Sequence, residues 1–231
     1  MKWFLIFAAG SLAAAAVEWA LAAPNPVEPP RASAAEGSDA VACANLIYAG
    51  TRSSVCFSDK FLTAVARDTT INTARKFKAV KLADKEVFEF PFCVMTGEGT
   101  FALTEGERVN LRRYLERGGF LLASAGCSSR QWDESFRREM RIIFQDRQLE
   151  AIPADHEIFH TIYEIKSLGA THGGPPPKLE GLSIGGKVVI IYSSDGLNDT
   201  STMHGCCCCG GNEIGDAQRV NANILAYALL Q

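Results

Sequence analysis

The stretch that decides the fold covers residues 104–123, TEGERVNLRRYLERGGFLLA. Thr104 followed three residues later by Glu107 forms a capping box, which marks the first turn of a helix. The glycine pair at 118–119 ends this helix, because glycine readily adopts the left-handed conformation found at helix C-termini. The apolar run that begins at Phe120 then predicts a buried strand. The stretch therefore predicts a helix that leads directly into the core of a sheet.

The same alternation continues on both sides of this stretch. Before it, apolar runs predict strands at 44–48, 77–82 and 92–95 and a short helix at 61–65. After it, the pattern predicts a helix at 131–144 with Trp132 and Phe136 facing the core, strands at 149–152 and 187–192, and a helix at 216–230. Residues 169–186 contain three consecutive prolines and are predicted to form a loop or short excursion.

Buried strands that alternate with amphipathic helices are typical of an α/β fold, with a mostly parallel sheet covered by helices on both faces. In such folds the loops that leave the carboxyl ends of the strands gather at one edge and build the site. Cys93 lies within a predicted strand and Cys127 directly follows one. We therefore expect Cys127 and the loop after strand 187–192 to share this edge, with Cys93 in the core.

A run of four cysteines in the loop after strand 187–192 marks the first candidate site. The run is Cys206, Cys207, Cys208 and Cys209, with His204 just before it. Thiolate and imidazole ligands suit zinc or another thiophilic metal. Adjacent side chains point in different directions, so two or three of them at most should bind one ion. Cys127 or Cys93 is expected to complete the set, with Cys127 preferred and His160 as a further candidate ligand.

The cysteine count leaves other interpretations open. Eight cysteines in an exported chain usually suggest disulfides. A chain of this length does not need them, and half of its cysteines are contiguous, which makes a poor disulfide framework. The alternatives to a metal are disulfides that link the run to Cys93, to Cys127 or within itself, or a reactive-thiol role. Cys43 and Cys56 are expected either to form an independent disulfide or to be buried apolar thiols.

Cys127 is also a candidate nucleophile. It lies where a strand turns into a helix, and a helix N-terminus favours the thiolate. A cysteine–histidine pair would use His156 or His160, although the sequence identifies no acidic partner for it. The stretch 156–160 spells H-E-x-x-H, a zinc-protease motif, but it lies just past Pro153 on what reads as a single turn. Capping or packing in that turn is the expected role of both histidines.

The N-terminus reads as an export signal. Lys2 supplies a short positive region, residues 3–17 an apolar region, and residues 20–22 a small-x-small cleavage site. We expect a signal peptide at 1–22, a flexible Pro-, Ala- and Glu-rich linker at 23–39 and one α/β domain at 40–231. No later segment is apolar for long enough to span a bilayer. The expected location is the periplasm or cell envelope, with an uncleaved anchor as the alternative.

Charge does not point to nucleic acid. The formal net charge is −3. The densest positive patch consists of Arg137, Arg138 and Arg141. Two glutamates, Glu134 and Glu139, lie among these arginines, which predicts an ordinary solvated helix face. We expect a protein or small-molecule partner in the cell envelope.

Several distinctive stretches occur in the order found in one bacterial family. They are FPF at 90–92 with MTG at 95–97, LERGGFL at 115–121, FRREM at 136–140, DHEIFH at 155–160 and RVNANI at 219–224. From about residue 77 to the C-terminus the chain resembles the domain-of-unknown-function 4159 family. The resemblance implies a class I glutamine amidotransferase-like or flavodoxin-like α/β fold. That family has no established activity, so the resemblance implies none here.

Together these features predict a binding module more than a conventional enzyme. The expected site holds a metal through Cys127 and the cysteine run at the carboxyl edge of the sheet. The enzyme alternative is a hydrolase or thiol-redox protein that uses Cys127. A third alternative is a disulfide-braced structural module of the cell envelope.

Overall fold

The computed structural model describes residues 40–50, 52, 56–200 and 212–231. The predicted signal peptide and linker, together with His204 and the cysteine run 206–209, lie outside the described residues. Within the described part of the chain, no helix is long and apolar enough to cross a membrane.

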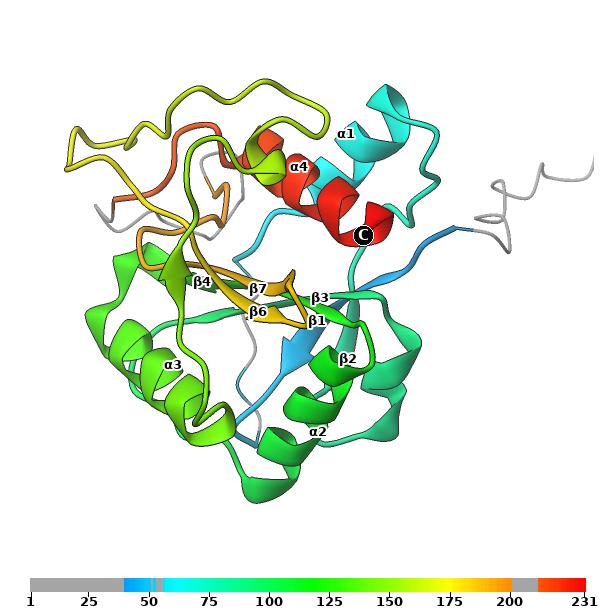
Figure 1. The fold of residues 1–231 in the computed structure, drawn as a ribbon, viewed down its shortest axis with the longest axis vertical. Coiled ribbons are helices and arrows are strands. Elements are labelled where there is room, and N and C mark those ends of the chain that lie inside the picture. The colour runs from blue at the N-terminus through cyan, green and yellow to red at the C-terminus, as the bar shows by residue number, and fades with distance from the viewer. Residues whose placement is uncertain (1–39, 51, 53–55, 201–211) are drawn as a thin grey trace, which may run out of the picture. The chain divides into compact units, whose positions relative to one another are not determined.

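A seven-stranded sheet forms the centre of the fold, in the order β2-β1-β3-β4-β7-β6-β5 (Figure 1). The strands are β1 (Cys43–Ile47), β2 (Lys78–Lys81), β3 (Phe92–Gly97), β4 (Phe120–Ala125), β5 (Glu150–Ala151), β6 (Glu180–Ile184) and β7 (Lys187–Ser193). From β2 to β7 all neighbouring strands are parallel, whereas β6 is antiparallel to β7 and β5 to β6. The sheet is therefore mostly parallel, as predicted.

Helices cover both faces of this sheet, as predicted (Figure 1). The helices are α1 (Lys60–Asp68), α2 (Glu105–Glu116), α3 (Arg130–Ile143) and α4 (Ala217–Leu230), with short 3-10 turns η1 (Lys85–Glu89), η2 (Gly126–Ser128) and η3 (Glu157–Phe159). Helices α1 and α4 lie on one face, and α2 and α3 lie on the other.

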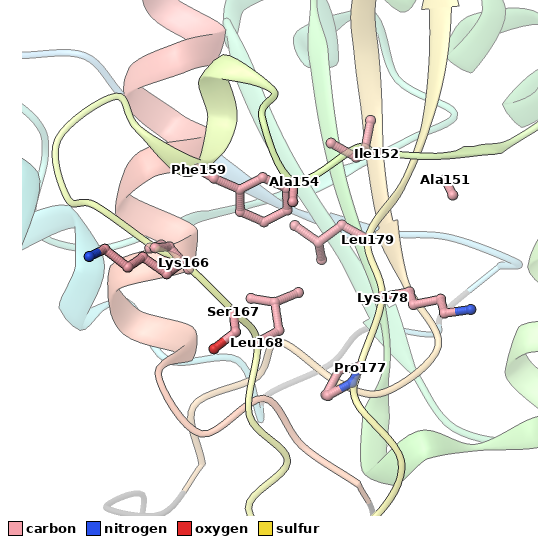
Figure 2. A pocket seen from close by; sticks show the side chains of 11 residues that line it. Ala151, Ile152, Ala154, Phe159, Lys166, Ser167, Leu168, Pro177, Lys178 and Leu179 are labelled. Atoms are coloured by element: carbon pink, nitrogen blue, oxygen red, sulfur yellow. The ribbon is translucent and has the colours of Figure 1, made fainter.

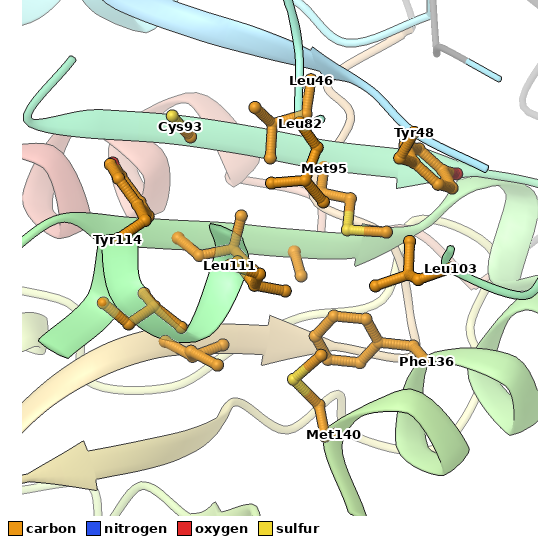
Figure 3. Packing of buried hydrophobic residues seen from close by; sticks show 14 of the residues in the cluster. Leu46, Tyr48, Leu82, Cys93, Met95, Leu103, Leu111, Tyr114, Phe136 and Met140 are labelled. Carbon is orange, nitrogen blue, oxygen red and sulfur yellow. The ribbon is translucent and has the colours of Figure 1, made fainter. Parts of the chain in front are cut away.

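Alternating strand residues divide the core between these two faces. In β3, Cys93 and Met95 face α2 and α3, where Phe136 packs as expected (Figure 3). Trp132 belongs to the same buried cluster, also as expected. Phe92 and its neighbours on the same side of the sheet face α1 and α4 instead. Both sides of each central strand are buried, which is why these strands read as continuous apolar runs.

The capping box of α2 forms as predicted. The Thr104 hydroxyl accepts a hydrogen bond from the Glu107 backbone N–H (3.3 Å), and the Glu107 carboxylate accepts one from the Thr104 N–H (2.7 Å). Gly118 follows the helix with φ +91°. This left-handed residue turns the chain into β4.

Strand β6 corrects the prediction of a loop at 169–186. Glu180–Ile184 pairs antiparallel with β7, joined by Gly185 (φ +60°) and Gly186 (φ +82°). Two central residues with positive φ are the requirement of a tight hairpin turn whose twist matches that of the strands. The glycine pair was therefore the signal for this hairpin.

The charged face of α3 is also more buried than expected. The Glu139 side chain is only 1% exposed, and its carboxylate pairs with the Arg108 guanidinium at 2.8 Å. Arg137 bridges Asp133 on its own helix and Glu180 on β6. The prediction of an ordinary solvated face is wrong for these side chains, because α2 and β6 supply partners far away in the sequence.

Candidate functional site

Described polar side chains gather at the carboxyl edge of the sheet, on the loops that follow β4 and β7 and on the segment before α4. We call this group the carboxyl-edge cluster. Its members are Cys127, Ser128, Asp195, Asp199, Asn212 and Glu213. The parallel strands β4 and β7 end side by side, so the loops that follow them meet, as the sequence predicted.

Cys127 lies in a left-handed turn immediately after β4. Its backbone has φ 50° and ψ 31°, and Ser128 follows with φ 51°. Non-glycine residues rarely adopt this conformation, and strained backbone of this kind tends to cluster at functional sites. Ser129 then caps α3, accepting a hydrogen bond from the Trp132 N–H (3.4 Å). The turn presents a partly exposed thiol beside the first turn of a long helix.

Ser128 and Asn212 join the three segments of the cluster. The Ser128 hydroxyl accepts a hydrogen bond from the Asn212 N–H (2.7 Å) and donates one to the Asp195 carbonyl (3.2 Å). The Asn212 side-chain amide donates to the Asp195 carboxylate (3.0 Å). The turn after β4, the loop after β7 and the lead into α4 are therefore held together by direct contacts.

Glu213 is a buried acid at this edge, with an exposed fraction of 5%. Burial raises the pKa of its carboxyl above the usual range, and the nearby charge of Asp199 raises it further. The Thr200 hydroxyl opposes this by donating to both carboxylate oxygens at 3.1 Å, and the charge of His172 opposes it as well. A raised pKa with a defined charge neighbour is typical of acids in functional sites.

Asp199 is the second acid with a perturbed pKa. Burial raises its pKa, and the charge of Asp216 adds to that effect. A hydrogen bond from Ser58 and the charge of Lys60 act in the opposite direction. Asp199 also has a left-handed backbone, with φ 52°. The carboxyl edge thus carries two carboxyl groups, Asp199 and Glu213, whose pKa values are raised by burial, close to the left-handed turn at Cys127.

Asn198 lies beneath the cluster and ties it to the sheet. Its side-chain oxygen accepts hydrogen bonds from the Ser124 (2.9 Å) and Thr96 (3.3 Å) hydroxyls at the ends of β4 and β3. Its amide donates to the Cys56 carbonyl at 2.7 Å, and its carbonyl accepts from the Ser58 N–H at 2.8 Å. One buried side chain therefore connects two strand ends to the segment that leads into α1.

The two histidines of the H-E-x-x-H stretch have roles within their own turn. The stretch forms only the short turn η3, and the His156 ring caps it by accepting a hydrogen bond from the Ile158 N–H at 3.2 Å. His160 contacts the Glu164 carboxylate (2.9 Å) and the Ala154 carbonyl (3.2 Å) through its two ring nitrogens. The bond to Glu164 raises the pKa of His160.

The structure does not bring His160 and Cys127 together. His160 lines a hollow with Leu230 and Gln231 at the end of α4. Gln231 donates a hydrogen bond to the carbonyl of Val188, near the start of β7. Cys127 lies at the opposite edge, where β4 ends. A ligand set or a catalytic pair made of these two residues is therefore not formed.

The described cysteines differ in burial and in whether they form a disulfide. Cys43 and Cys93 are free and buried, and burial raises the pKa of each thiol to about 12. Cys56 is disulfide-bonded, and its partner is none of Cys43, Cys93 and Cys127. The predicted disulfide between Cys43 and Cys56 is wrong, and the alternative of a buried apolar thiol holds for Cys43.

No group of three or more His, Cys, Asp and Glu side chains within residues 40–50, 52, 56–200 and 212–231 is arranged to hold a metal ion. The predicted metal site depends on His204 and the cysteine run, which lie outside those ranges. The sequence did not single out Glu213 or His172. For Glu213 the available signal was position, because it directly follows the loop that carries the cysteine run.

Replacing Glu213 with glutamine is expected to raise the free energy of unfolding at neutral pH by about 1 kcal/mol, because a buried charge is removed while an acceptor for Thr200 is kept. Because the pKa of Glu213 is raised on folding, this carboxyl keeps its proton in the folded protein at pH values above about 4, where it loses the proton in the unfolded chain. Stability therefore falls as pH rises from there through the raised pKa of Glu213. Urea unfolding at a series of pH values should show a smaller fall for Glu213→Gln.

Glu107→Gln is the matched control for that prediction. Glu107 is also a buried glutamate, but it serves the capping box of α2, where glutamine is an accepted substitute. It should show no gain in stability at neutral pH. If Glu213→Gln is no more stable than the wild type at any pH, burial of the Glu213 carboxylate does not destabilise the folded protein, and the prediction is wrong.

The family described as "Domain of unknown function (DUF4159)" has a model that matches residues 44–229. The matched range begins in β1, ends in α4 and contains the whole carboxyl-edge cluster. A comparison with curated proteins found no match.

Proposed function

The chain belongs to the DUF4159 family, whose description assigns no activity, and we propose that it is a binding module and not a conventional enzyme. Its site is the carboxyl-edge cluster, where Cys127 and cysteines of the run 206–209, with His204, hold zinc or another thiophilic metal. The module works in the periplasm or cell envelope after removal of residues 1–22. Its partner there is a protein or small molecule, and the net charge of −3 argues against nucleic acid.

The observation that carries this proposal is the backbone of Cys127. Two successive left-handed residues, Cys127 and Ser128, place a partly exposed thiol at the strand edge where ligands bind in α/β folds. The turn is braced by the bonds of Ser128 to Asp195 and Asn212. A thiol held in a braced turn suits a metal ligand, because a preformed position lowers the entropic cost of binding.

The finer fold assignment is part of the same proposal. Counted along the chain, the five parallel strands have the order 2-1-3-4-5, which is the order of flavodoxin-like sheets. This order supports a flavodoxin-like or class I glutamine amidotransferase-like fold. The antiparallel strands β6 and β5 extend that sheet at one side.

A cysteine hydrolase has weaker support. Neither histidine of the H-E-x-x-H stretch lies at the carboxyl edge, so neither can activate Cys127 there. His172 is close enough to affect the pKa of Glu213, and it is the described histidine that a nucleophile at this edge would have to use.

The disulfide of Cys56 favours a second candidate, a disulfide-braced module of the cell envelope. The Cys56 carbonyl accepts a hydrogen bond from Asn198, so the disulfide is anchored at the same edge of the sheet. Disulfides persist in the oxidising compartments to which a signal peptide directs a chain.

Elemental analysis of the mature protein from its own envelope compartment tests the metal. We expect about one equivalent of zinc or a similar ion in the wild type. Removing a residue that only hydrogen-bonds to a metal ligand lowers metal affinity by roughly 10–100-fold, and Cys127→Ser, which removes a ligand itself, should lower it further. Cys93→Ala is the control, because Cys93 lies in the core between the sheet and α2. It should keep the metal.

Counting free thiols on the same sample separates the two candidates. Thiols that react only after chelation support the metal. A sample without metal, in which only the buried Cys43 and Cys93 react after denaturation, would overturn it and leave the disulfide-braced module.

A further inference from the structure

A hollow of about 300 Å³ lies within the excursion between β5 and β6, on the α4 side of the sheet (Figure 2). Its wall is mainly aliphatic and aromatic, and Phe159 and Leu179 are buried beside it. The side chains that line it are Ala151, Ile152, Ala154, Phe159, Ile165, Lys166, Ser167, Leu168, Pro177, Lys178 and Leu179. It is separate from the carboxyl-edge cluster, and the proposed metal plays no part in it.

The walls of this hollow are anchored to the rest of the fold. Asn223 on α4 is fully buried, and its side-chain oxygen accepts hydrogen bonds from the N–H groups of Ile162 (3.1 Å) and Tyr163 (2.8 Å). Its amide donates to the Tyr163 carbonyl (2.8 Å). The two ends of the excursion meet where the Ile152 N–H donates to the Leu179 carbonyl (2.9 Å). The hollow is therefore a preformed site, which is typical of small-molecule pockets.

Among the described residues that line the hollow, the charged side chains are two lysines, Lys166 and Lys178. Neither ammonium group forms an ion pair with another described residue. Figure 2 shows the two ammonium groups on opposite sides of the hollow, at the outer ends of stems directed away from its centre. The stems extend the apolar wall, and the ammonium groups are available to an anion at the mouth.

We propose that this hollow binds an aliphatic carboxylate of roughly ten carbon atoms, because a cavity of about 150 Å³ accommodates benzene and this one is twice as large. The alkyl chain lies against Phe159, Leu168 and Leu179. The carboxylate lies at the mouth and pairs with Lys166 or Lys178. An apolar body with one negative end matches both the lining and the charge of the site.

Isothermal titration calorimetry of the full chain tests this proposal, with decanoate below its micellar concentration as the probe. Decyltrimethylammonium, of equal chain length and opposite charge, is the ligand control. We expect decanoate to bind at least about 10-fold more tightly than the cation. The double variant Lys166→Gln/Lys178→Gln should lose about 2- to 5-fold in decanoate affinity, as expected for an exposed ion pair.

A blocking variant tests the location. Ala154 is exposed and lines the hollow, so Ala154→Trp should fill it and abolish measurable decanoate binding. Ala102→Trp places the same side chain at an exposed position that does not line the hollow, and Lys81→Gln/Lys187→Gln removes two other exposed lysines. Both controls should bind as the wild type does. Equal affinity for the cation, unchanged binding by Ala154→Trp, or no decanoate binding by the wild type would each overturn the proposal.

Discussion

Replacing Asn198 with alanine is expected to lower the free energy of unfolding by about 3 kcal/mol. The Asn198 side chain is buried, and it accepts from the Ser124 and Thr96 hydroxyls while it donates to the Cys56 carbonyl. Alanine would leave these buried groups without their partner, at about 1–3 kcal/mol for each unsatisfied group. The Ser124 hydroxyl keeps its hydrogen bond from the Leu197 N–H (2.6 Å), so this hydroxyl loses only one of its two hydrogen-bond partners.

Urea denaturation followed by tryptophan fluorescence measures this effect. Asn110→Ala is the matched control, because the Asn110 amide also makes two hydrogen bonds, to the carbonyls of Leu82 and Ala83, but at a half-buried position. Its loss should stay below about 1 kcal/mol, since water replaces the amide. A loss for Asn198→Ala as small as that of the control would show that Asn198 does not hold the strand ends together.

Replacing Trp132 with alanine is expected to lower the free energy of unfolding by about 3–5 kcal/mol, the range for large aromatic side chains in a core. Trp132 is fully buried and its ring stacks on Phe136 at 5.2 Å between centroids. Its indole N–H donates to the Tyr48 hydroxyl (2.7 Å), which donates to the Thr96 carbonyl (2.9 Å). This chain of hydrogen bonds links α3, the residue that directly follows β1, and β3 just below the carboxyl edge.

A double-mutant cycle separates packing from hydrogen bonding. Trp132→Phe and Tyr48→Phe each remove one partner of the indole–hydroxyl bond and keep most of the apolar surface. We expect each to cost about 1–2 kcal/mol and the pair to show a coupling of about 1 kcal/mol. A Trp132→Ala loss below 2 kcal/mol, or no coupling in the cycle, would contradict this description of the core.

Elements with strong local signals were predicted correctly. The capping box of α2 lies within four residues, Thr104 to Glu107, so its chemistry is complete in the sequence. The buried strands β3 and β4 appear as unbroken apolar runs because both of their sides face helices. The position of Cys127 at the carboxyl edge also followed from the sequence, since parallel strands must end at a common edge.

Strand β6 and the buried acid Glu213 were missed for a different reason. Glu180–Ile184 is a strand because β7 lies beside it, and the run EGLSI has little strand propensity of its own. Burial and the charge of Asp216 raise the pKa of Asp199, and burial and the charge of Asp199 raise the pKa of Glu213. Thirteen positions of sequence separate the hydrogen-bonded pair Thr200 and Glu213. No local pattern encodes that contact.

The sequence by itself determined the α/β class, the helices on both faces of the sheet and the place of Cys127, because periodicity, capping and strand direction are local properties. Only the tertiary structure decided that Glu139 is a buried partner of Arg108, that His160 lies away from Cys127, and that Asn198 joins three segments. Those relations depend on which surfaces meet after folding. Burial then sets the energy of each polar group, and a linear pattern does not contain that information.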